Sequence, residues 1–368
     1  MRWFGGALSA IALAIGLQAI FVTVFWPHAH PPAPRMITRA PSHPGEATVM
    51  FAGDTAQVDA GLETFQERGL EWSFGSTLDL ISAPDLTVVN LEGPITDGGD
   101  RYPLWQKFVY RAPSRSAEVL AWAGIDVVNL ANNHARDYGA SGLSDTLALT
   151  SRAGLVSFGA GANEDEARRG LIAQIGEARV GFLGYLEDQI EWRFYSDLFA
   201  RAHHPGIARL TDSALAEDIA RLRPLVDVLV VSFHIGTNYT PPKKSTIAWS
   251  ERAVELGADL VIDHHPHVAH PLMVHLGRPI ALSLGNFAFA TEGHEELDYG
   301  WLLTAHISGR ALDRVEMVPL SVQNRRVRFR PEPLVGEERG RVLAAFASAS
   351  AEYGAKLKVE ADRVVWTR

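Results

Sequence analysis

The amino-acid sequence predicts an α/β fold, in which strands covered on both faces alternate with helices. Short apolar runs recur along the chain and are separated by stretches with helical periodicity, as in α/β domains. The runs are continuously apolar rather than alternating, which is typical of strands buried on both faces. Polar residues that bind metals follow several runs directly, where ligands collect in helix-covered sheets. We expect these strands at residues 47–54, 85–93, 125–134, 179–185, 226–236, 258–267 and 279–289.

The first element is an apolar segment from Trp3 to Trp26 that carries no charged residue. A helix rising about 1.5 Å per residue would cross a hydrocarbon core of about 30 Å over this length. The two tryptophans suit the membrane interfaces, and Arg2 indicates a cytoplasmic N-terminus. We therefore expect residues 1–26 to be a single-pass transmembrane anchor in the cell membrane, with the following domain outside the cytoplasm.

A cleaved signal peptide is the alternative for this segment, because signal peptides also have an apolar core. The sequence that follows, PHAHPPAPR, is a poor cleavage site and favours an uncleaved anchor. Residues 27–45 are rich in proline and lack apolar periodicity, so we expect a semi-extended linker there.

Helices are expected between the strands, where periodic segments begin at a capping residue or stop at glycine. The helix expected at residues 211–224 has Thr211 or Asp212 as its cap. Two further helices are expected to end at a glycine, at residues 114–124 and 243–257.

Toward the C-terminus, residues 301–309 and 314–323 predict an antiparallel pair of strands, and residues 336–354 predict an amphipathic helix. After the anchor and the linker, we therefore expect a main domain at residues 46–323 and a C-terminal extension at residues 324–368.

Composition excludes several functional classes. The 368 residues are 47% hydrophobic and 21% charged, as in an ordinary globular protein. A formal net charge of −9, without a basic stripe, argues against nucleic-acid binding. The chain has no cysteine, so disulfides, thiolate metal sites and cysteine nucleophiles are excluded. Any metal must be held by oxygen and imidazole ligands.

Six of the predicted strands end in such ligands. Because ligands gather beyond the carboxyl ends of helix-covered strands, we expect these side chains to form one site. A mixed oxygen and imidazole set suits divalent Mn, Fe or Zn, as one ion or two. The residues at the strand ends are Asp54, Asn90, Glu92, Asn133, His134, His234, Asp263, His264, His265, His267 and Asn286.

Turn formation is the alternative explanation for these residues taken singly. Asp54 follows a glycine, and Asn132 and Asn133 both suit a turn. A lone histidine on an apolar strand, such as His234, is more often a core residue. The segment DHHPH at residues 263–267 favours a metal, because three imidazoles are costly to bury unless their nitrogens are occupied.

A shared metal site would have a definite chemistry. Two ions about 3.5–4 Å apart would generate hydroxide from bound water and neutralise a phosphoryl oxygen. A neighbouring imidazole that binds no metal would protonate the leaving group.

The motifs GD, NLEGPIT, LANNHxxDYG, HxG, HHPHV and SLGNF occur in this order and resemble those of the CapA/PgsA capsule-synthesis family. The resemblance runs over residues 47–289. The family is associated with poly-γ-glutamate biosynthesis and is similar to the calcineurin-like metallophosphoesterases. It implies a four-layer α/β/β/α sandwich of two mixed sheets, with paired metals at the strand ends.

The resemblance also implies roles for individual residues. His134 would be the catalytic imidazole, with Asp137 orienting it. Glu92 would bridge two ions. The metal ligands that it implies are Asp54, Glu92, Asn133, His234, His265 and His267. We further expect the amides of Asn90, Asn132 and Asn286 to contact the substrate.

Three positions depart from the related patterns. Ala56 stands where calcineurin-like enzymes have a histidine, Asn238 replaces the glutamate of HWGxEY, and Asp263 replaces the glycine that usually precedes HHPH.

Three functions therefore stay open. We favour a metal-dependent phosphoesterase-like hydrolase that acts on a phosphorylated substrate or on an anionic polymer such as poly-γ-glutamate, alongside capsule-synthesis membrane proteins. The rival is a non-catalytic scaffold that binds the polymer during assembly or transport. Metal-dependent amide chemistry on the γ-glutamyl backbone is the third.

Overall fold

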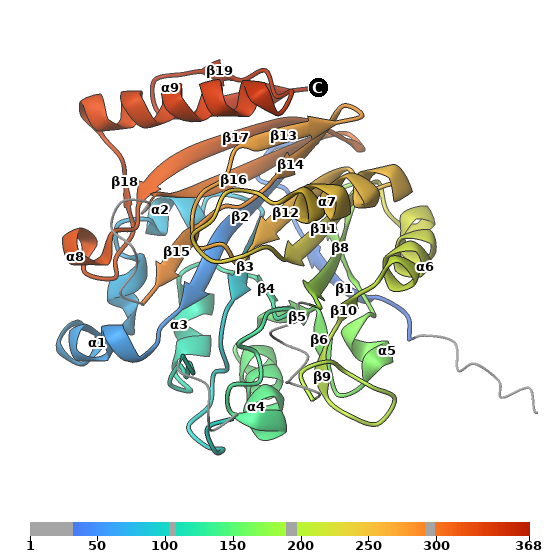
Figure 1. Cartoon of the computed structure of the whole chain (residues 1–368), viewed down its shortest axis with the longest axis vertical. Coiled ribbons are helices and arrows are strands. Elements are labelled where there is room, and N and C mark those ends of the chain that lie inside the picture. The colour runs from blue at the N-terminus through green and yellow to red at the C-terminus, as the bar shows by residue number, and fades with distance from the viewer. Residues whose placement is uncertain (1–31, 103–107, 189–196, 291–298) are drawn as a thin grey trace, which may run out of the picture. The chain divides into compact units, whose positions relative to one another are not determined.

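Two large mixed β-sheets dominate the fold (Figure 1). The computed structural model describes residues 32–102, 108–188, 197–290 and 299–368, all of which belong to the unit Pro31–Arg368. The sequence-based expectation of an α/β fold with two mixed sheets is confirmed. The anchor expected at residues 1–26 lies outside the described residues. No helix within them has both the length and the apolarity that crossing a bilayer requires.

The first sheet has eight strands, and its centre is parallel. Across the sheet the strands are β1 (Arg35–Arg39), β7 (Leu171–Ile175), β8 (Ala178–Glu187), β11 (Val228–His234), β12 (Leu260–His264), β14 (Arg278–Ala281) and β13 (Leu272–His275), with β10 (Arg209–Leu210) added beside β8.

The second sheet has ten strands, antiparallel at one end and parallel at the other. Across the sheet they are β19 (Lys358–Val359), β20 (Val364–Thr367), β17 (Ala311–Ser321), β16 (Tyr299–Ser308), β2 (Glu46–Ala56), β3 (Leu86–Leu91), β4 (Val127–Asn129) and β5 (Val156–Phe158), with β15 (Asn286–Phe289) beside β2 and β18 (Glu332–Pro333) beside β17. A separate small pair joins β6 (Ala160–Gly161) to β9 (Gly206–Ile207).

Helices pack on the outer faces of both sheets. The apolar sides of α6 (Asp212–Leu222) and α7 (Lys244–Leu256) cover the eight-stranded sheet. Those of α1 (Leu62–Arg68), α3 (Ser116–Trp122) and α4 (Gly139–Arg152) cover the ten-stranded sheet. The remaining helices are α2 (Leu78–Ile81), α5 (Glu164–Ala167), α8 (Asn324–Val327) and α9 (Gly336–Glu352).

Two helix ends lie where the sequence predicts them. Thr211 caps α6, because its hydroxyl accepts a hydrogen bond from the Ala214 N–H at 3.1 Å. Gly257 ends α7 with a positive φ of 121°, a backbone conformation that glycine adopts without a side-chain clash.

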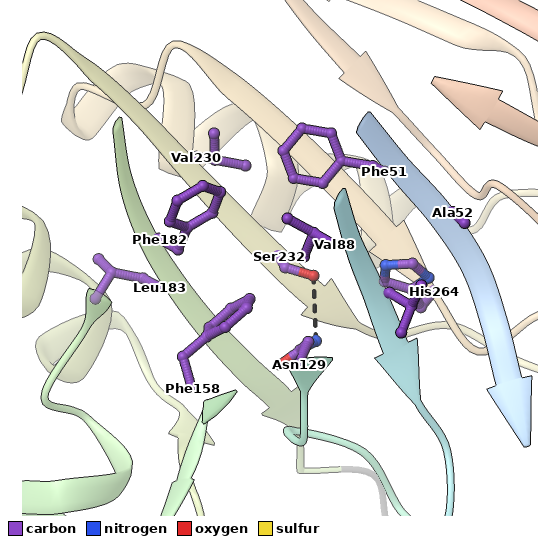
Figure 2. Close-up of a pocket in the computed structure, with 11 residues that line it drawn as sticks. Phe51, Ala52, Val88, Asn129, Phe158, Phe182, Leu183, Val230, Ser232 and His264 are labelled. Carbon is purple, nitrogen blue, oxygen red and sulfur yellow. Dashed lines mark hydrogen bonds between the residues drawn. The ribbon is translucent and has the colours of Figure 1, made fainter. Parts of the chain in front are cut away.

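The inner faces of the sheets share one apolar core (Figure 2). The Phe51 ring of β2 and the Phe158 ring of β5 lie 6.3 and 6.0 Å from the Phe182 ring of β8. Each fully buried ring of this kind stabilises the fold by about 1.5–3 kcal/mol. A polar contact within this core also joins the sheets: the Asn129 amide of β4 donates a hydrogen bond to the Ser232 hydroxyl of β11 at 3.2 Å.

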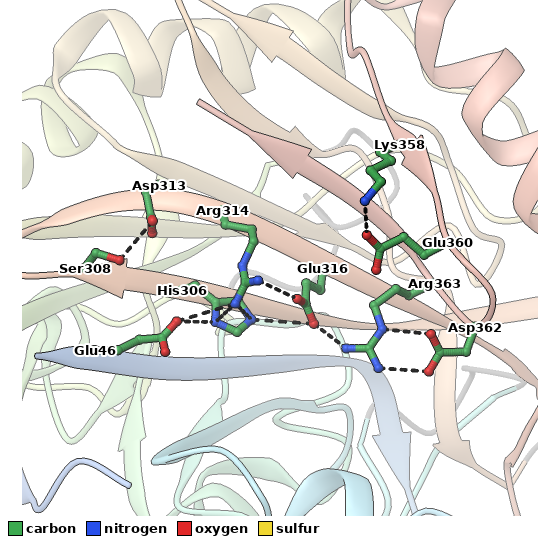
Figure 3. A network of polar contacts seen from close by, with 10 residues as sticks. All are labelled: Glu46, His306, Ser308, Asp313, Arg314, Glu316, Lys358, Glu360, Asp362 and Arg363. Atoms are coloured by element: carbon green, nitrogen blue, oxygen red, sulfur yellow. Dashed lines mark hydrogen bonds and ion pairs between the residues drawn. The ribbon is translucent and has the colours of Figure 1, made fainter. Parts of the chain in front are cut away.

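The outer face at the other end of β2 is polar (Figure 3). His306 of β16 lies 2.8 Å from Glu46, and Arg314 of β17 pairs with Glu316 at 3.2 Å. Glu316 also pairs with Arg363, just before β20. These ion pairs tie the C-terminal strand to the middle of the sheet.

The structure corrects several expected elements. Residues 35–39, within the expected linker 27–45, form β1 and pair in parallel with β7. The single strand expected at residues 279–289 is two strands, β14 and β15, which lie in different sheets. The strand expected at residues 125–134 is only three residues long, because a turn begins before Asn132. The expected extension 324–368 adds strands β18, β19 and β20 to the ten-stranded sheet.

The expected antiparallel pair is confirmed in β16 and β17, whose register runs from Tyr299 opposite Ser321 to Ser308 opposite Ala311.

Candidate metal site

The strand ends of the two sheets meet at one place. Asp54 and Asn90 close β2 and β3 of the ten-stranded sheet, and His234 closes β11 of the eight-stranded sheet. The Asn90 amide joins them, since it donates to Asp54 Oδ1 at 2.8 Å and lies 3.3 Å from His234 Nδ1. The predicted convergence of remote segments is present in the geometry.

Asp54, His267 and Asn286 form one side of the cluster. His267 Nδ1 lies 3.2 Å from Asp54 Oδ2 and 2.9 Å from Asn286 Oδ1. His264 approaches the same carboxylate, with its Nδ1 3.4 Å from Asp54 Oδ1. All four side chains are buried.

The other side of the cluster holds Asn133, His234 and His265. His234 Nε2 lies 2.8 Å from Asn133 Oδ1 and 3.1 Å from His265 Nδ1. Two imidazoles and an amide oxygen thus point to one place, which is the ligand group expected for a second ion.

Glu92 lies between the two sides. Its Oε1 is 3.5 Å from His234 Nε2 and 3.7 Å from His267 Nε2. Its side chain is fully buried, and neither carboxylate oxygen has a hydrogen-bond partner among the described residues. A buried carboxylate is normally paired, hydrogen-bonded or bound to a metal. Ligand atoms of Glu92, His265 and His267 all lie within 4.8 Å of one another, so this donor set fits a divalent cation.

Burial and neighbouring charges set the pKa values in the cluster. Burial, reinforced by the charge of Asp54, raises the pKa of Glu92 well above its ordinary range. Burial and then His265 hold the pKa of His234 well below its usual value. Burial and then His267 lower the pKa of His265 to about 3. His234 and His265 are therefore neutral near pH 7, which is the form that binds metals.

The pKa of His267 shifts in the opposite direction. Burial alone would lower its pKa, but the charges of Glu92 and Asp54 outweigh burial and raise it to about 9. The raised pKa favours the protonated, positively charged imidazole, which lies between Asp54 and Glu92. A metal ion would take over that role.

His134 is held beside this cluster by Asp137. Its Nδ1 lies 2.7 Å from Asp137 Oδ2, and the Tyr110 N–H donates to the same oxygen at 2.6 Å. The Tyr110 ring lies over the imidazole at a centroid distance of 4.1 Å. Asp137 thereby fixes the ring orientation of His134, as expected from the sequence.

The backbone at the site is unusually close-packed. The Asp54 N–H donates to the Gly285 carbonyl at 3.0 Å, which brings β15 against β2. A Cβ on Gly53 would lie 1.9 Å from that carbonyl oxygen, so this approach requires glycine. His265 and His267 have positive φ values of 98° and 57°. Such strain costs about 1–3 kcal/mol per residue and is characteristic of functional sites.

The three amides expected to contact substrate have structural partners instead. Asn132 donates to the Leu91 carbonyl at 2.8 Å and accepts from the His134 N–H at 3.2 Å, which is the turn role weighed above. Asn90 donates a hydrogen bond to Asp54, and the Asn286 side-chain oxygen lies 2.9 Å from His267 Nδ1. These contacts indicate positioning rather than substrate binding.

Three neighbours of the site make contacts that the sequence does not predict. The Asn129 amide donates to the Asn90 side-chain oxygen at 3.3 Å. The only sign of this role in the sequence is that Asn129 is the polar residue in the apolar run VVNL. His264 was visible within HHPH, but its contact with Asp54 was not. Tyr110 lies in WQKFVYR, where the sequence pattern gives no sign that it covers His134.

The departures from the related patterns have different surroundings. Ala56 is buried and pairs with Phe289, so no ligand replaces a histidine there. Asn238 is exposed. Asp263 faces α7, where it accepts a hydrogen bond from the Ser250 hydroxyl at 2.8 Å.

Comparison with known proteins shows a family match. Residues 48–291 match the family described as "Bacterial capsule synthesis protein PGA_cap". The chain is 27% identical to the "Capsule biosynthesis protein CapA" of Bacillus anthracis, over 75% of this chain and 67% of the relative. It is 31% identical to a "Probable polyglutamine synthesis accessory protein" of Mycobacterium tuberculosis, over 70% of this chain and 71% of the relative.

Two solved structures show weaker likeness. A Staphylococcus aureus protein assigned as a 5′-nucleotidase has 13% identity and a TM-score of 0.44, over 82% of this chain and 58% of that one. A purple acid phosphatase from yellow lupin seeds has 8% identity and a TM-score of 0.36, over 78% of this chain and 54% of that one. At these TM-scores neither likeness assigns a function to this chain.

Proposed function

The chain belongs to the family of bacterial capsule synthesis proteins, and from this premise we propose that it is a metal-dependent hydrolase of the metallophosphoesterase type, acting in the synthesis or export of an anionic surface polymer. The names of two relatives mention capsule biosynthesis and polyglutamine synthesis, which supports the polymer part of the proposal. The hydrolytic part is supported by the residues at the strand ends.

The observation that carries the proposal is the environment of Glu92. Its side chain is fully buried, neither carboxylate oxygen has a hydrogen-bond partner among the described residues, and the ring nitrogens of His234 and His267 lie 3.5 and 3.7 Å from it, a donor set that fits a divalent cation. We propose that Glu92 bridges two divalent ions, either Mn, Fe or Zn. Asp54 and His267 would hold one ion, and Asn133, His234 and His265 the other.

The bound ions would supply an activated water and neutralise charge on the reacting group. The chain's own residues have the remaining tasks. Asp137 accepts the His134 Nδ1–H, which leaves Nε2 of that imidazole to hold the proton that the leaving group takes. Tyr110 packs over the ring and covers it from one side.

The test is hydrolysis of 4-nitrophenyl phosphate by the full chain loaded with Mn²⁺ or Zn²⁺. The His134→Ala variant should lose activity by about 10²–10⁴-fold, the range for a general acid. Elemental analysis of both proteins should give equal metal content. Activity that is absent from the wild-type protein, or equal in both proteins, would refute the hydrolase.

A polymer-binding scaffold is the second candidate, and Ala56 is the observation that favours it. With alanine at that position, the Asp54 side of the cluster has one ligand fewer than in calcineurin-like enzymes. Metal would then shape a binding surface without supporting turnover. Polymer binding retained in a protein with no hydrolytic activity would support this function.

We propose further that residues 1–26 anchor the protein in the cell membrane with the described domain outside the cytoplasm. The apolar sequence from Trp3 to Trp26 supports this. The full chain should remain in the membrane fraction after carbonate washing, and a chain starting at residue 32 should not. Protease added to intact spheroplasts should digest the domain.

A further inference from the structure

The segment between β11 and α7, residues 235–243, lies along the histidine-bearing segment that follows β12. The Ile235 N–H donates to the His264 carbonyl at 3.0 Å, and the Tyr239 N–H donates to the Pro266 carbonyl at 2.8 Å. This β11–α7 segment therefore forms one wall beside the proposed ligands.

Two aromatic side chains continue that wall over the cluster. The Tyr239 ring lies 5.9 Å from the His267 ring. Tyr110, which covers His134, meets the Phe289 ring edge-on at 5.6 Å. Burial raises the pKa of the Tyr110 phenol above its ordinary value, as do the nearby charges of Glu92 and Tyr239, so it stays a neutral hydroxyl donor. The two tyrosines therefore flank the same group of ligands.

Lys243 closes the β11–α7 segment and is exposed. Its ammonium donates to the hydroxyl of Thr237, which lies in the same segment, three residues after His234. Within the described part of the chain, no carboxylate forms an ion pair with it. A cation in this place is available to an anionic ligand.

We infer that Lys243 binds a second negative charge of the substrate, beyond the group that reacts at the metal site. The inference rests on the proposed function and narrows its substrate class. The substrate is a molecule with repeated anionic groups, such as a chain of carboxylates, rather than a lone phosphate ester. The Tyr110 and Tyr239 rings flank the ligands beside this segment.

The test measures binding and needs no turnover. A fluorescent γ-linked glutamate oligomer is titrated with the full chain in detergent, loaded with Zn²⁺ and carrying His134→Ala. Adding Lys243→Ala should weaken binding about fivefold, the size expected for one exposed ion pair. The adjacent exposed Lys244 gives the matched control, and Lys244→Ala should change the Kd by less than about twofold.

Further outcomes also test the inference. An oligomer of γ-linked glutamine should bind weakly and show no dependence on Lys243, and Lys243→Arg should restore binding of the acidic oligomer. Equal Kd values for Lys243→Ala and Lys244→Ala would overturn the inference, as would failure of the parent protein to bind the acidic oligomer. If wild type hydrolyses nothing but the Lys243 dependence persists, the hydrolase fails and this binding role stands.

Discussion

Asp137 uses one carboxylate oxygen for two tasks, since Oδ2 accepts from both the Tyr110 N–H and the His134 imidazole. Replacement by asparagine puts an N–H₂ group in reach of these donors and disfavours the Nδ1–H form of His134. We expect Asp137→Asn to lower kcat for an aryl phosphate by about 10–100-fold, the usual effect of losing such an orienting group. Steady-state kinetics at matched metal content would measure it.

The control for this substitution is Asp79→Asn on the exposed side of α2, which should leave kcat unchanged. An Asp137→Asn protein with normal metal content and wild-type kcat would show that His134 needs no orienting carboxylate.

The convergence of the proposed ligands was easier to predict from the sequence than the residues that support them. Asp54, Glu92, His234, His265 and His267 come together because the ends of buried strands in the two sheets lie side by side. Asn129 was not identified, because a polar residue inside an apolar run does not reveal its partner. Only the packing of the sheets shows that its amide reaches Asn90 and Ser232.

Among the elements, α6 is attached to β8 through one buried carboxylate. Asp218 of α6 is fully buried and accepts from the Tyr185 hydroxyl at 2.9 Å and from Arg168 Nε at 3.0 Å. Arg221 lies 3.0 Å from its other oxygen. We expect Asp218→Asn to destabilise the protein by about 1–3 kcal/mol, because the substitution removes the buried counter-charge that Arg168 and Arg221 share. Urea unfolding would measure the change.

The neighbouring Glu217 provides the control for this prediction. It also pairs with Arg168, at 2.9 Å, but its side chain is 67% exposed. Glu217→Gln should therefore change the free energy of unfolding by no more than about 1 kcal/mol. Equal losses from the two substitutions would mean that burial does not set the strength of this cluster.

A second carboxylate fastens the start of β2 to the start of β3. Asp85 accepts from the Thr48 N–H at 2.8 Å and the Thr48 hydroxyl at 2.9 Å, and also from the Ser42 N–H. Burial alone would raise the pKa of Asp85, but these hydrogen bonds outweigh burial and hold it below its ordinary value of 3.8. A lowered pKa in the folded state means that the stabilisation is present above pH 3.8 and disappears as the pH falls through the folded-state value.

Asp85→Asn should accordingly reduce the free energy of unfolding by about 1–3 kcal/mol at pH 7. The difference from wild type should be the same at pH 5 and should shrink below pH 3.8. Denaturation midpoints at pH 7, 5 and 3 would test this. A difference that stays constant down to pH 3 would contradict the assigned role.

Element boundaries were predicted less well than element types, for a physical reason. Residues 279–289 are apolar except for Ser283, Gly285 and Asn286, and so short a polar interruption does not show that the chain leaves one sheet for the other there. Residues 35–39 have arginine at both ends and no continuous apolar run, and β1 lies at the edge of its sheet, where it is only half-buried. An edge strand of five residues after a proline-rich stretch resembles a linker in sequence.

At the scale of the molecule, metal binding and folding should be linked. A ligand that binds only the folded state adds about 2.7 kcal/mol to the free energy of unfolding at 100 times its Kd. Mn²⁺ or Zn²⁺ added to chelator-treated protein should raise the melting temperature accordingly. The Glu92→Gln variant should lose most of this increase, because its amide cannot bridge two cations. A wild-type melting temperature unaffected by either metal would argue against a metal site.

The proposed ligands come from both sheets: Asp54 and Glu92 follow strands of one, and His234 and His265 follow strands of the other. An ion between them would act as a cross-link across the interface that Phe51 and Phe182 fill. Repacking that interface by even one ring, far from any ligand, would therefore shift the coordination geometry. Substitutions in the two sheets are not independent, and a graft of either sheet into another scaffold would transfer only half of the coordinating set.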